Sequence, residues 1–202
     1  ILATVLSLAF TQVTAQDFSK GVEALEADDF ATALKEFKPL AEQGNAEAQN
    51  KLGYMYEYGK GVLKDVTEAA KWNRLSAEQG NANGQYKLAM RHLKGEGVLQ
   101  DYAETLKWLR LSAEQGGGFY SNLAQAFLGI MYEYGDGVLQ DNVTAHMWYN
   151  IASANGSVNA NGSVSADEYR DKLAGLMTAS EITKATTMAK ECMSSGYKKC
   201  GY

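Results

Sequence analysis

The chain repeats itself, and this periodicity limits the possible folds more than any other feature. A Gly-x-Gly-Val phrase begins at Gly59, Gly95 and Gly135, and a tryptophan follows each copy at one fixed offset (Trp72, Trp108 and Trp148). The residue numbers place successive copies 36 and 40 residues apart. A period of this length, in units too short to bury their own apolar faces, is typical of a solenoid of stacked helical repeats.

Each unit is expected to hold two antiparallel helices. In the first unit, apolar residues recur at helical spacing over 46–58, and Gly53 would let the partner helix approach closely. The Gly-x-Gly stretch should end this helix, because glycine reaches positive φ without steric cost. Asp65 and Asp101, each with a glutamate three residues later, predict the starts of the second helices. The sequence therefore predicts an all-α protein.

The third unit carries four extra residues. We expect them within 116–121, in the turn before that unit, because only one set of markers keeps the 36-residue step. The glycines keep it (Gly44, Gly80 and Gly116), whereas the glutamines do not (Gln49, Gln85 and Gln125).

The full pattern resembles the Sel1-like repeat, a relative of the tetratricopeptide repeat. It reads Ala-Gln-x-x-Leu-Gly-x-x-Tyr-x-x-Gly-x-Gly-Val-x-x-Asp, followed by Ala, Trp and Ala-x-x-Gly, and runs from Ala48 to Gly80 in the first unit. The second unit departs from it at Ala89 and His92, and the third through its insertion. The resemblance covers about residues 17–156. It implies an α-solenoid of antiparallel helix pairs with adaptor or assembly roles, and some relatives are described as β-lactamases.

Six segments follow from this interpretation. Solenoids need terminal units that cover the last apolar face, and capping boxes that begin at Ser165 and Thr178 predict two closing helices. The segments are 1–15, a truncated signal peptide; 17–44, a shortened leading repeat; 45–80, 81–116 and 117–156, the three repeats; and 157–202, a loop with C-terminal capping helices and a cysteine pair.

The first ten residues are apolar and uncharged, and small residues at 13–15 offer a cleavage point before Gln16. This is typical of a secretory signal peptide, and an ordinary apolar first helix is the alternative. The run is too short to span a bilayer. We therefore expect a periplasmic or secreted protein with no stable membrane span after cleavage.

Cys192 and Cys200 are the only cysteines, and their closeness at the end of the chain favours a disulfide. Such a bond would stabilise the fold by roughly 2–3 kcal/mol in the chain-entropy model. Two free thiols or a metal pair are the alternatives. Zinc would need two more ligands, and the two histidines, His92 and His146, stand where sister repeats have aromatic or apolar residues. No metal or cofactor is expected.

The charge and the absence of catalytic motifs argue against nucleic-acid binding and against enzymatic activity. The net charge is −5, and 19 basic residues are spread among 24 acidic ones, so nucleic acid is not an expected partner. Gly-x-Gly-Val follows a helix and lacks the lysine and hydroxyl of a phosphate loop. No nucleophile stands in a recognisable setting, and no Ser-x-x-Lys motif occurs with its partners. We therefore expect that the protein is not an enzyme. The alternative, a cell-wall or β-lactam-acting enzyme, rests on the family resemblance alone.

Binding is the function that the repeats favour. Stacked units create a concave surface lined by the first helix of each pair, suited to a peptide or protein partner. The chain is thus predicted to be an interaction scaffold or adaptor, and packing between repeats is the alternative role for the same positions. The candidate binding residues are Asn50, Tyr54, Tyr58, Tyr86, Met90, Lys94, Ile130 and Tyr134.

Overall fold

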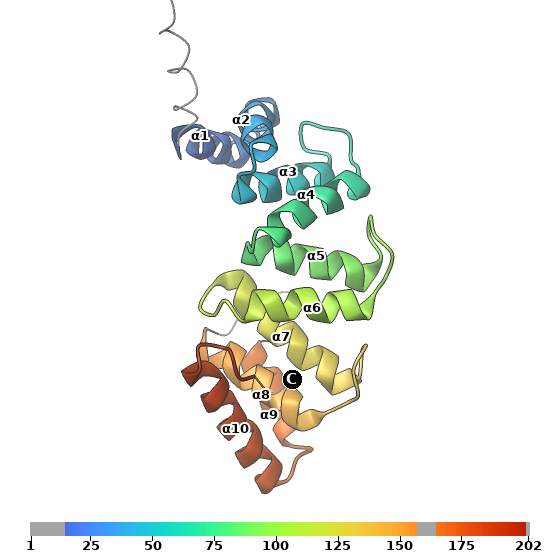
Figure 1. The fold of residues 1–202 in the computed structure, drawn as a ribbon, viewed down its shortest axis with the longest axis vertical. Coiled ribbons are helices and arrows are strands. Elements are labelled where there is room, and N and C mark those ends of the chain that lie inside the picture. Colours follow the sequence, from blue (N-terminus) through green and yellow to red (C-terminus); the bar gives the residue numbers. More distant parts are fainter. Residues whose placement is uncertain (1–14, 157–164, 201–202) are drawn as a thin grey trace, which may run out of the picture.

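The computed structural model describes residues 15–156 and 165–200, which form ten α-helices and no strand. The helices stack along the longest axis from α1 at one end to α10 at the other (Figure 1). Their bounds are α1 Ala15–Glu26, α2 Phe30–Glu42, α3 Ala46–Tyr58, α4 Val66–Glu78, α5 Ala82–Lys94, α6 Tyr102–Ala113, α7 Phe119–Tyr134, α8 Asn142–Ala154, α9 Ala166–Ala174 and α10 Ala179–Ser194. The predicted all-α solenoid is confirmed. The apolar run at residues 1–14 and the loop at 157–164 lie outside the described residues.

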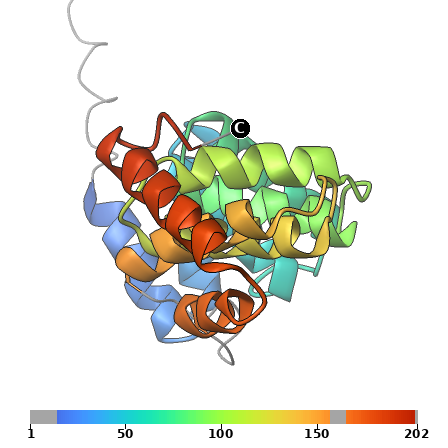
Figure 2. The same cartoon turned by 90° about the horizontal axis from the view of Figure 1, so that it is seen from below.

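Neighbouring helices pack in chain order. Helices α1, α3, α5 and α7 each pack against the helix that follows, and α2, α4 and α6 contact the first helix of the next unit. At the C-terminal end, seen from below in Figure 2, α8 contacts both α9 and α10. These two helices close the stack, as the capping motifs predict.

The helix ends follow the sequence signals. Gly59, with φ 68°, caps the C-terminus of α3, and Oδ1 of Asp65 accepts hydrogen bonds from the backbone N–H groups of Thr67 and Glu68 at the start of α4. The same arrangement recurs in the next two units. Before α10, Thr178 and Glu181 form a complete capping box.

The second glycine of each loop holds neighbouring units together. Gly97 has φ 75°, and a Cβ atom added there would lie 2.1 Å from the carbonyl oxygen of Val66, the first residue of α4. A residue with a Cβ atom does not fit so close to a backbone oxygen. Within a unit, a Cβ at Gly53 would lie 3.2 Å from the carbonyl oxygen of Ala69, which confirms the predicted close approach of the two helices.

Buried glutamines connect successive units. Their Nε2 atoms each donate to a carbonyl near the end of the preceding unit, and their Oε1 atoms each accept from an amide at the end of their own unit. The first bonds are Gln49 to Ala41 at 3.1 Å, Gln85 to Ala77 at 3.3 Å and Gln125 to Ala113 at 3.0 Å. The second come from Gln79 at 2.7 Å, Gln115 at 2.7 Å and Asn155 at 3.0 Å. This polar ladder fixes the register between units.

The insertion is only partly a turn. Helix α7 has 16 residues, whereas α3 and α5 have 13 each, and it begins at Phe119, inside the stretch 116–121 that was predicted to be a turn. The ring of Tyr120 packs 5.7 Å from that of Tyr86, which favours continuation of the helix over these residues.

Candidate functional site

Of the hollows on the face formed by the first helices, two contain six of the eight predicted residues. The first, of about 310 Å³, is bordered by α3, α5 and α7, and four predicted residues line it: Tyr58, Tyr86, Met90 and Lys94. The second, of about 380 Å³, is bordered by α1, α3, α5 and α7, and is lined by Asn50 and Tyr54. Lys87 lines both hollows. We call the first helix of each pair helix A, and the two hollows together the A-helix groove.

The predicted residues differ in exposure. Tyr58 and Tyr134 are exposed, at 55% and 61%, and Lys94 is exposed as well. Tyr54, Met90 and Ile130 are half-buried, and Ile130 and Tyr134 line neither hollow.

Tyr86 and Asn50 are buried. The ring of Tyr86 packs against Tyr120 and Phe127, and burial raises the pKa of its hydroxyl to about 12. Nδ2 of Asn50 donates to Oδ1 of Asn81, 2.8 Å away. Tyr86 therefore contributes to packing between units as well as to the wall of the groove.

Sequence analysis missed Arg91, a buried arginine at the wall of the first hollow. Its Nε donates to Oδ1 of Asn73 at 2.8 Å, and its Nη2 to Oε2 of Glu57 at 2.9 Å. The corresponding residues of the other two units are Met55 and Met131, both fully buried. The sequence did contain a signal for this residue, because the same position is methionine in the other two units.

Tyr58 stands at the rim of the same hollow. Burial, and secondly the negative charge of Glu57, raise the pKa of its hydroxyl above the ordinary value. The phenol is therefore neutral at physiological pH and can donate a hydrogen bond.

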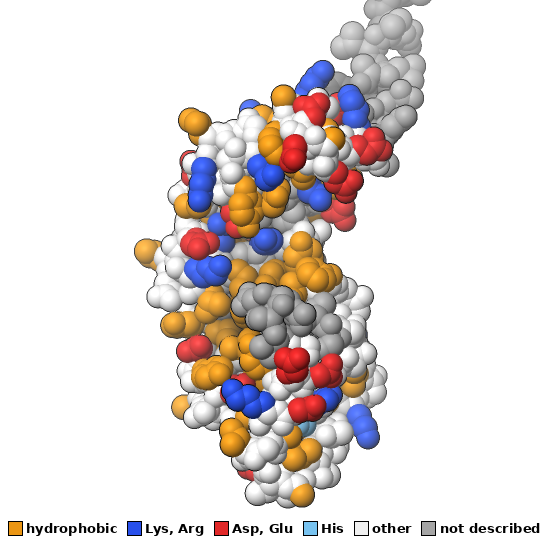
Figure 3. Space-filling view, turned by 180° about the vertical axis from the view of Figure 1, so that it is seen from behind, with side chains coloured by type: hydrophobic (Ala, Val, Ile, Leu, Met, Phe, Trp, Pro, Cys, Tyr) orange, Lys and Arg blue, Asp and Glu red, His pale blue; other side chains and the backbone are white. Residues whose placement is uncertain are grey.

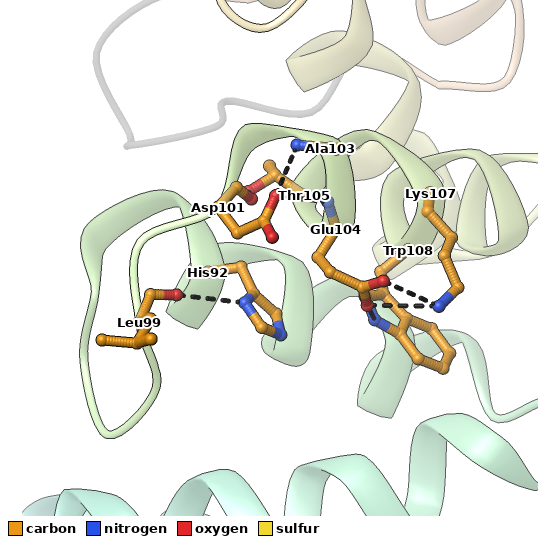
Figure 4. Close-up of polar contacts among 8 residues, drawn as sticks. All are labelled: His92, Leu99, Asp101, Ala103, Glu104, Thr105, Lys107 and Trp108. Atoms are coloured by element: carbon orange, nitrogen blue, oxygen red, sulfur yellow. Dashed lines mark hydrogen bonds and ion pairs between the residues drawn. The ribbon is translucent and has the colours of Figure 1, made fainter.

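His92 lies in the last turn of α5 and faces the loop of the second unit (Figure 4). It is buried, and its Nδ1 lies 3.2 Å from the carbonyl oxygen of Leu99. Beside it, Glu104 accepts from Nε1 of Trp108 at 2.8 Å and pairs with Lys107 at 2.9 Å, and this lysine holds the pKa of the glutamate below its ordinary value. His92 thus contacts the loop from α5, and Oδ1 of Asp101, at the end of the loop, accepts from the backbone N–H of Ala103 in the first turn of α6. The contacts of Glu104 lie within α6.

His146 is buried in α8. Its Nδ1 lies 3.0 Å from Nδ2 of Asn150. Burial, and then the positive charge of Arg170, lower the pKa of the imidazole, while Asp171 acts in the opposite direction. Within 15–156 and 165–200, no three His, Cys, Asp or Glu side chains gather as a metal site requires.

The predicted disulfide between Cys192 and Cys200 is present. It closes a short loop in which the hydroxyl of Tyr197 lies 2.9 Å from Nδ2 of Asn155, at the end of α8. The loop is thereby held against the last repeat.

A row of exposed leucines forms a second surface. Leu63, Leu99 and Leu139 occupy the same position of the three Gly-x-Gly loops and are 91%, 89% and 91% exposed. We call this the loop-leucine row. No helix in the described part of the chain has the length and apolarity to cross a membrane.

These features define a class of protein: a helical-repeat solenoid with a groove on its first-helix face. Three copies of the Sel1 repeat match residues 46–81, 82–117 and 122–157, which together exceed half of the chain. The chain belongs to the Sel1 repeat family, as the sequence pattern predicts. Proteins with this repeat generally serve as scaffolds for protein–protein interaction and not as enzymes.

Two solved structures are similar over most of the chain. A Sel1 repeat protein from Oxalobacter formigenes is 28% identical, with a TM-score of 0.72 over 88% of this chain and 72% of that one. A protective antigen of uropathogenic Escherichia coli strains, which displays an SLR fold, is 26% identical with a TM-score of 0.58. That match covers 90% of this chain but only 46% of the antigen. A comparison with curated proteins finds no significant match.

Proposed function

We propose that this protein is a scaffold or adaptor that binds a protein or peptide partner in the A-helix groove. The observation that carries the proposal is that the two hollows share Lys87 and so lie next to each other across the first helices of successive units. Aromatic side chains wall it, and aromatic residues contribute strongly to binding energy at protein interfaces. The general scaffold role of Sel1 repeats supports this function.

Binding rather than turnover is favoured by the lining of the groove. Neither hollow is lined by a serine, cysteine or histidine among the described residues. A nucleophile and its base would have to stand within hydrogen-bond reach of each other and of a substrate site. The cell-wall or β-lactam-acting alternative gains no support from these two hollows.

The test is capture of a partner from a periplasmic or secreted extract by immobilised protein. The parent is compared with Tyr54→Ala/Tyr58→Ala/Tyr134→Ala, which removes aromatic area from the first-helix face, and with a variant that changes the three loop leucines to alanine. We expect the tyrosine variant to lose the captured protein and the leucine variant to keep it. The reverse result would place the interface on the loop-leucine row and contradict the groove. Circular dichroism verifies that both variants fold.

We further propose that the protein acts outside the cytoplasm, in the periplasm or as a secreted protein. The apolar first residues and the disulfide support this location, because disulfides persist in oxidising compartments. Thiol trapping in fractionated cells should find both cysteines oxidised in the periplasmic or secreted fraction. Free thiols in a cytoplasmic pool would contradict this location.

A further inference from the structure

Arg91 is a charged residue that the fold does not require. In the other two units the same position is a buried methionine, so the packing of the corresponding helices, α3 and α7, is satisfied without a charge. Burying a guanidinium group is costly, and a well-packed apolar side chain is often at least as stabilising. The arginine therefore needs a reason beyond stability.

The terminal Nη1 amino group of this arginine has no hydrogen-bond acceptor among the described residues. Nε and Nη2 bond to Asn73 and Glu57, whereas Nη1 is buried without a partner there. Because Arg91 lines the first hollow, its buried guanidinium group places positive charge close to the wall of the groove. A buried N–H without an acceptor is costly to leave in that state.

Three lysines line the groove near Arg91. Lys87 and Lys94 lie one turn before and one turn after Arg91 on α5, and both line the first hollow. Lys51, the counterpart of Lys87 in the first unit, lines the second hollow. No ion pair within the described residues joins any of these three lysines. Figure 3 shows hydrophobic side chains across the middle of one face, with Lys and Arg side chains among them in its upper half.

The lining of the groove therefore has a small net positive charge on an acidic molecule. This lining holds four cationic side chains, those just named, against three carboxylates, Glu26, Glu57 and Glu96, and Glu57 is already paired with Arg91. The whole chain carries a net charge of −5. Charge complementarity of this kind selects partners and raises the rate of association.

The second hollow offers an unused acceptor. Asn50 is 6% exposed and its Nδ2 bonds to Asn81, but its Oδ1 has no donor among the described residues. A backbone N–H of an extended peptide supplies such a donor, whereas a helical peptide uses its N–H groups internally. In the adjoining hollow, Met90 and Phe127 offer apolar surfaces against which apolar side chains of such a peptide can pack.

From these contacts we propose that the groove binds an acidic peptide segment of a partner protein in extended form. A carboxylate of the peptide lies over Arg91 between Lys87 and Lys94, and a backbone N–H faces Oδ1 of Asn50. This inference rests on the proposed function and specifies the chemistry of the partner. A second copy of this chain is the competing occupant that the test must exclude.

The test measures fluorescence anisotropy of short labelled peptides mixed with the whole protein. One peptide alternates glutamate with leucine and phenylalanine; its counterparts carry glutamine or lysine in place of glutamate. We expect the glutamate peptide to bind about tenfold more tightly than the glutamine peptide, and to weaken as salt is raised. Equal binding of the two, preference for the lysine peptide, or no binding at all overturns the inference.

Two variants locate the site. Lys87→Glu/Lys94→Glu should abolish the preference for glutamate, whereas Lys184→Glu/Lys190→Glu, an equal charge change on exposed positions of α10, should keep it. Glu57→Leu/Arg91→Met leaves the net charge unchanged. It installs the leucine that the second unit carries at the first position (Leu93) and the methionine that the other two units carry at the second. It should also lose the preference. Retained preference in both groove variants overturns the inference.

The outcomes separate this inference from the proposed function. If the tyrosine variant loses its captured partner while all three peptides bind alike, the groove is an interface and its acidic specificity is wrong. If capture is unaffected by that variant, both proposals fail. Sedimentation over a range of concentrations tests the second copy: a dimer that the glutamate peptide does not dissociate contradicts the acidic-peptide inference.

Discussion

The side-chain amide of Gln85 donates to the carbonyl oxygen of Ala77, 3.3 Å away across the boundary between the first and second units. The same glutamine accepts from Nε2 of Gln115 at 2.7 Å, at the end of its own unit. One buried side chain thus links both ends of a repeat to the repeat before it. Because buried amides are costly when unpaired, this ladder penalises any shift in the stacking of the units.

Replacing Gln85 by leucine should lower the free energy of unfolding by about 1–3 kcal/mol, since Gln115 loses an acceptor and Ala77 a donor. The loss is limited because the carbonyl of Ala77 also accepts from the backbone N–H of Gly80. Urea unfolding followed by circular dichroism measures it. Gln43→Leu, at an exposed position, is the control and should shift stability by no more than about 0.5 kcal/mol. Equal unfolding midpoints for the two variants would show that the ladder contributes nothing.

Substitutions at Gly97 and Gly80 distinguish the backbone strain of a positive φ from the steric clash of an added Cβ atom. Both have positive φ, 75° and 83°, but a Cβ at Gly97 would meet the oxygen of Val66 at 2.1 Å whereas nothing lies within 4 Å of one at Gly80. Gly80→Ala should cost about 1–2 kcal/mol from backbone strain alone. Gly97→Ala should cost about 1–3 kcal/mol more, because neighbouring units must separate. Thermal and urea unfolding of both variants would reveal the difference; similar costs would contradict the contact between the loop and α4.

The sequence predicted those parts of the fold that every unit repeats. The Gly-x-Gly loops and the aspartate caps could be read because the same backbone requirement recurs three times. The disulfide followed from two nearby cysteines.

The groove was harder to predict, because its properties come from residues that differ between units. Arg91 stands where packing alone would place methionine, and its partners Asn73 and Glu57 lie on two other helices. Tyr86 was predicted to bind a partner, but it also packs against rings from the next unit. Sequence spacing gives the side of a helix on which a residue lies, not the neighbour that covers it.

Acidification should act on stability through His146. Its pKa in the folded protein is lowered from the ordinary 6.5, so below that value the unfolded chain binds a proton more readily than the folded one. The free energy of unfolding should therefore fall as the pH drops from about 7.5 to about 5.5. His146→Leu, which copies Leu106 of the preceding unit, should flatten this dependence. Carboxylates with lowered pKa, such as Glu104, act at lower pH. An unchanged slope in the leucine variant would exclude His146 as the cause.

The disulfide and the tyrosine inside its loop can be tested independently. Cys192→Ser/Cys200→Ser should lower the free energy of unfolding by roughly 2–3 kcal/mol, because the unfolded chain regains the freedom that the cross-link removes. Tyr197→Phe keeps the cross-link and removes only the hydrogen bonds to Asn155, at 2.9 and 3.1 Å, so it should cost about 1 kcal/mol.

Hydrogen exchange distinguishes the two variants, because each should increase exchange in a different helix. Loss of the cross-link should increase exchange in the last turn of α10, which contains Cys192, whereas the phenylalanine variant should affect mainly the end of α8 beside Asn155. A reducing agent applied to the parent should reproduce the double-serine variant. If reduction leaves both stability and exchange unchanged, the C-terminal loop is held by packing of Tyr197 against Gly116 and not by the covalent bond.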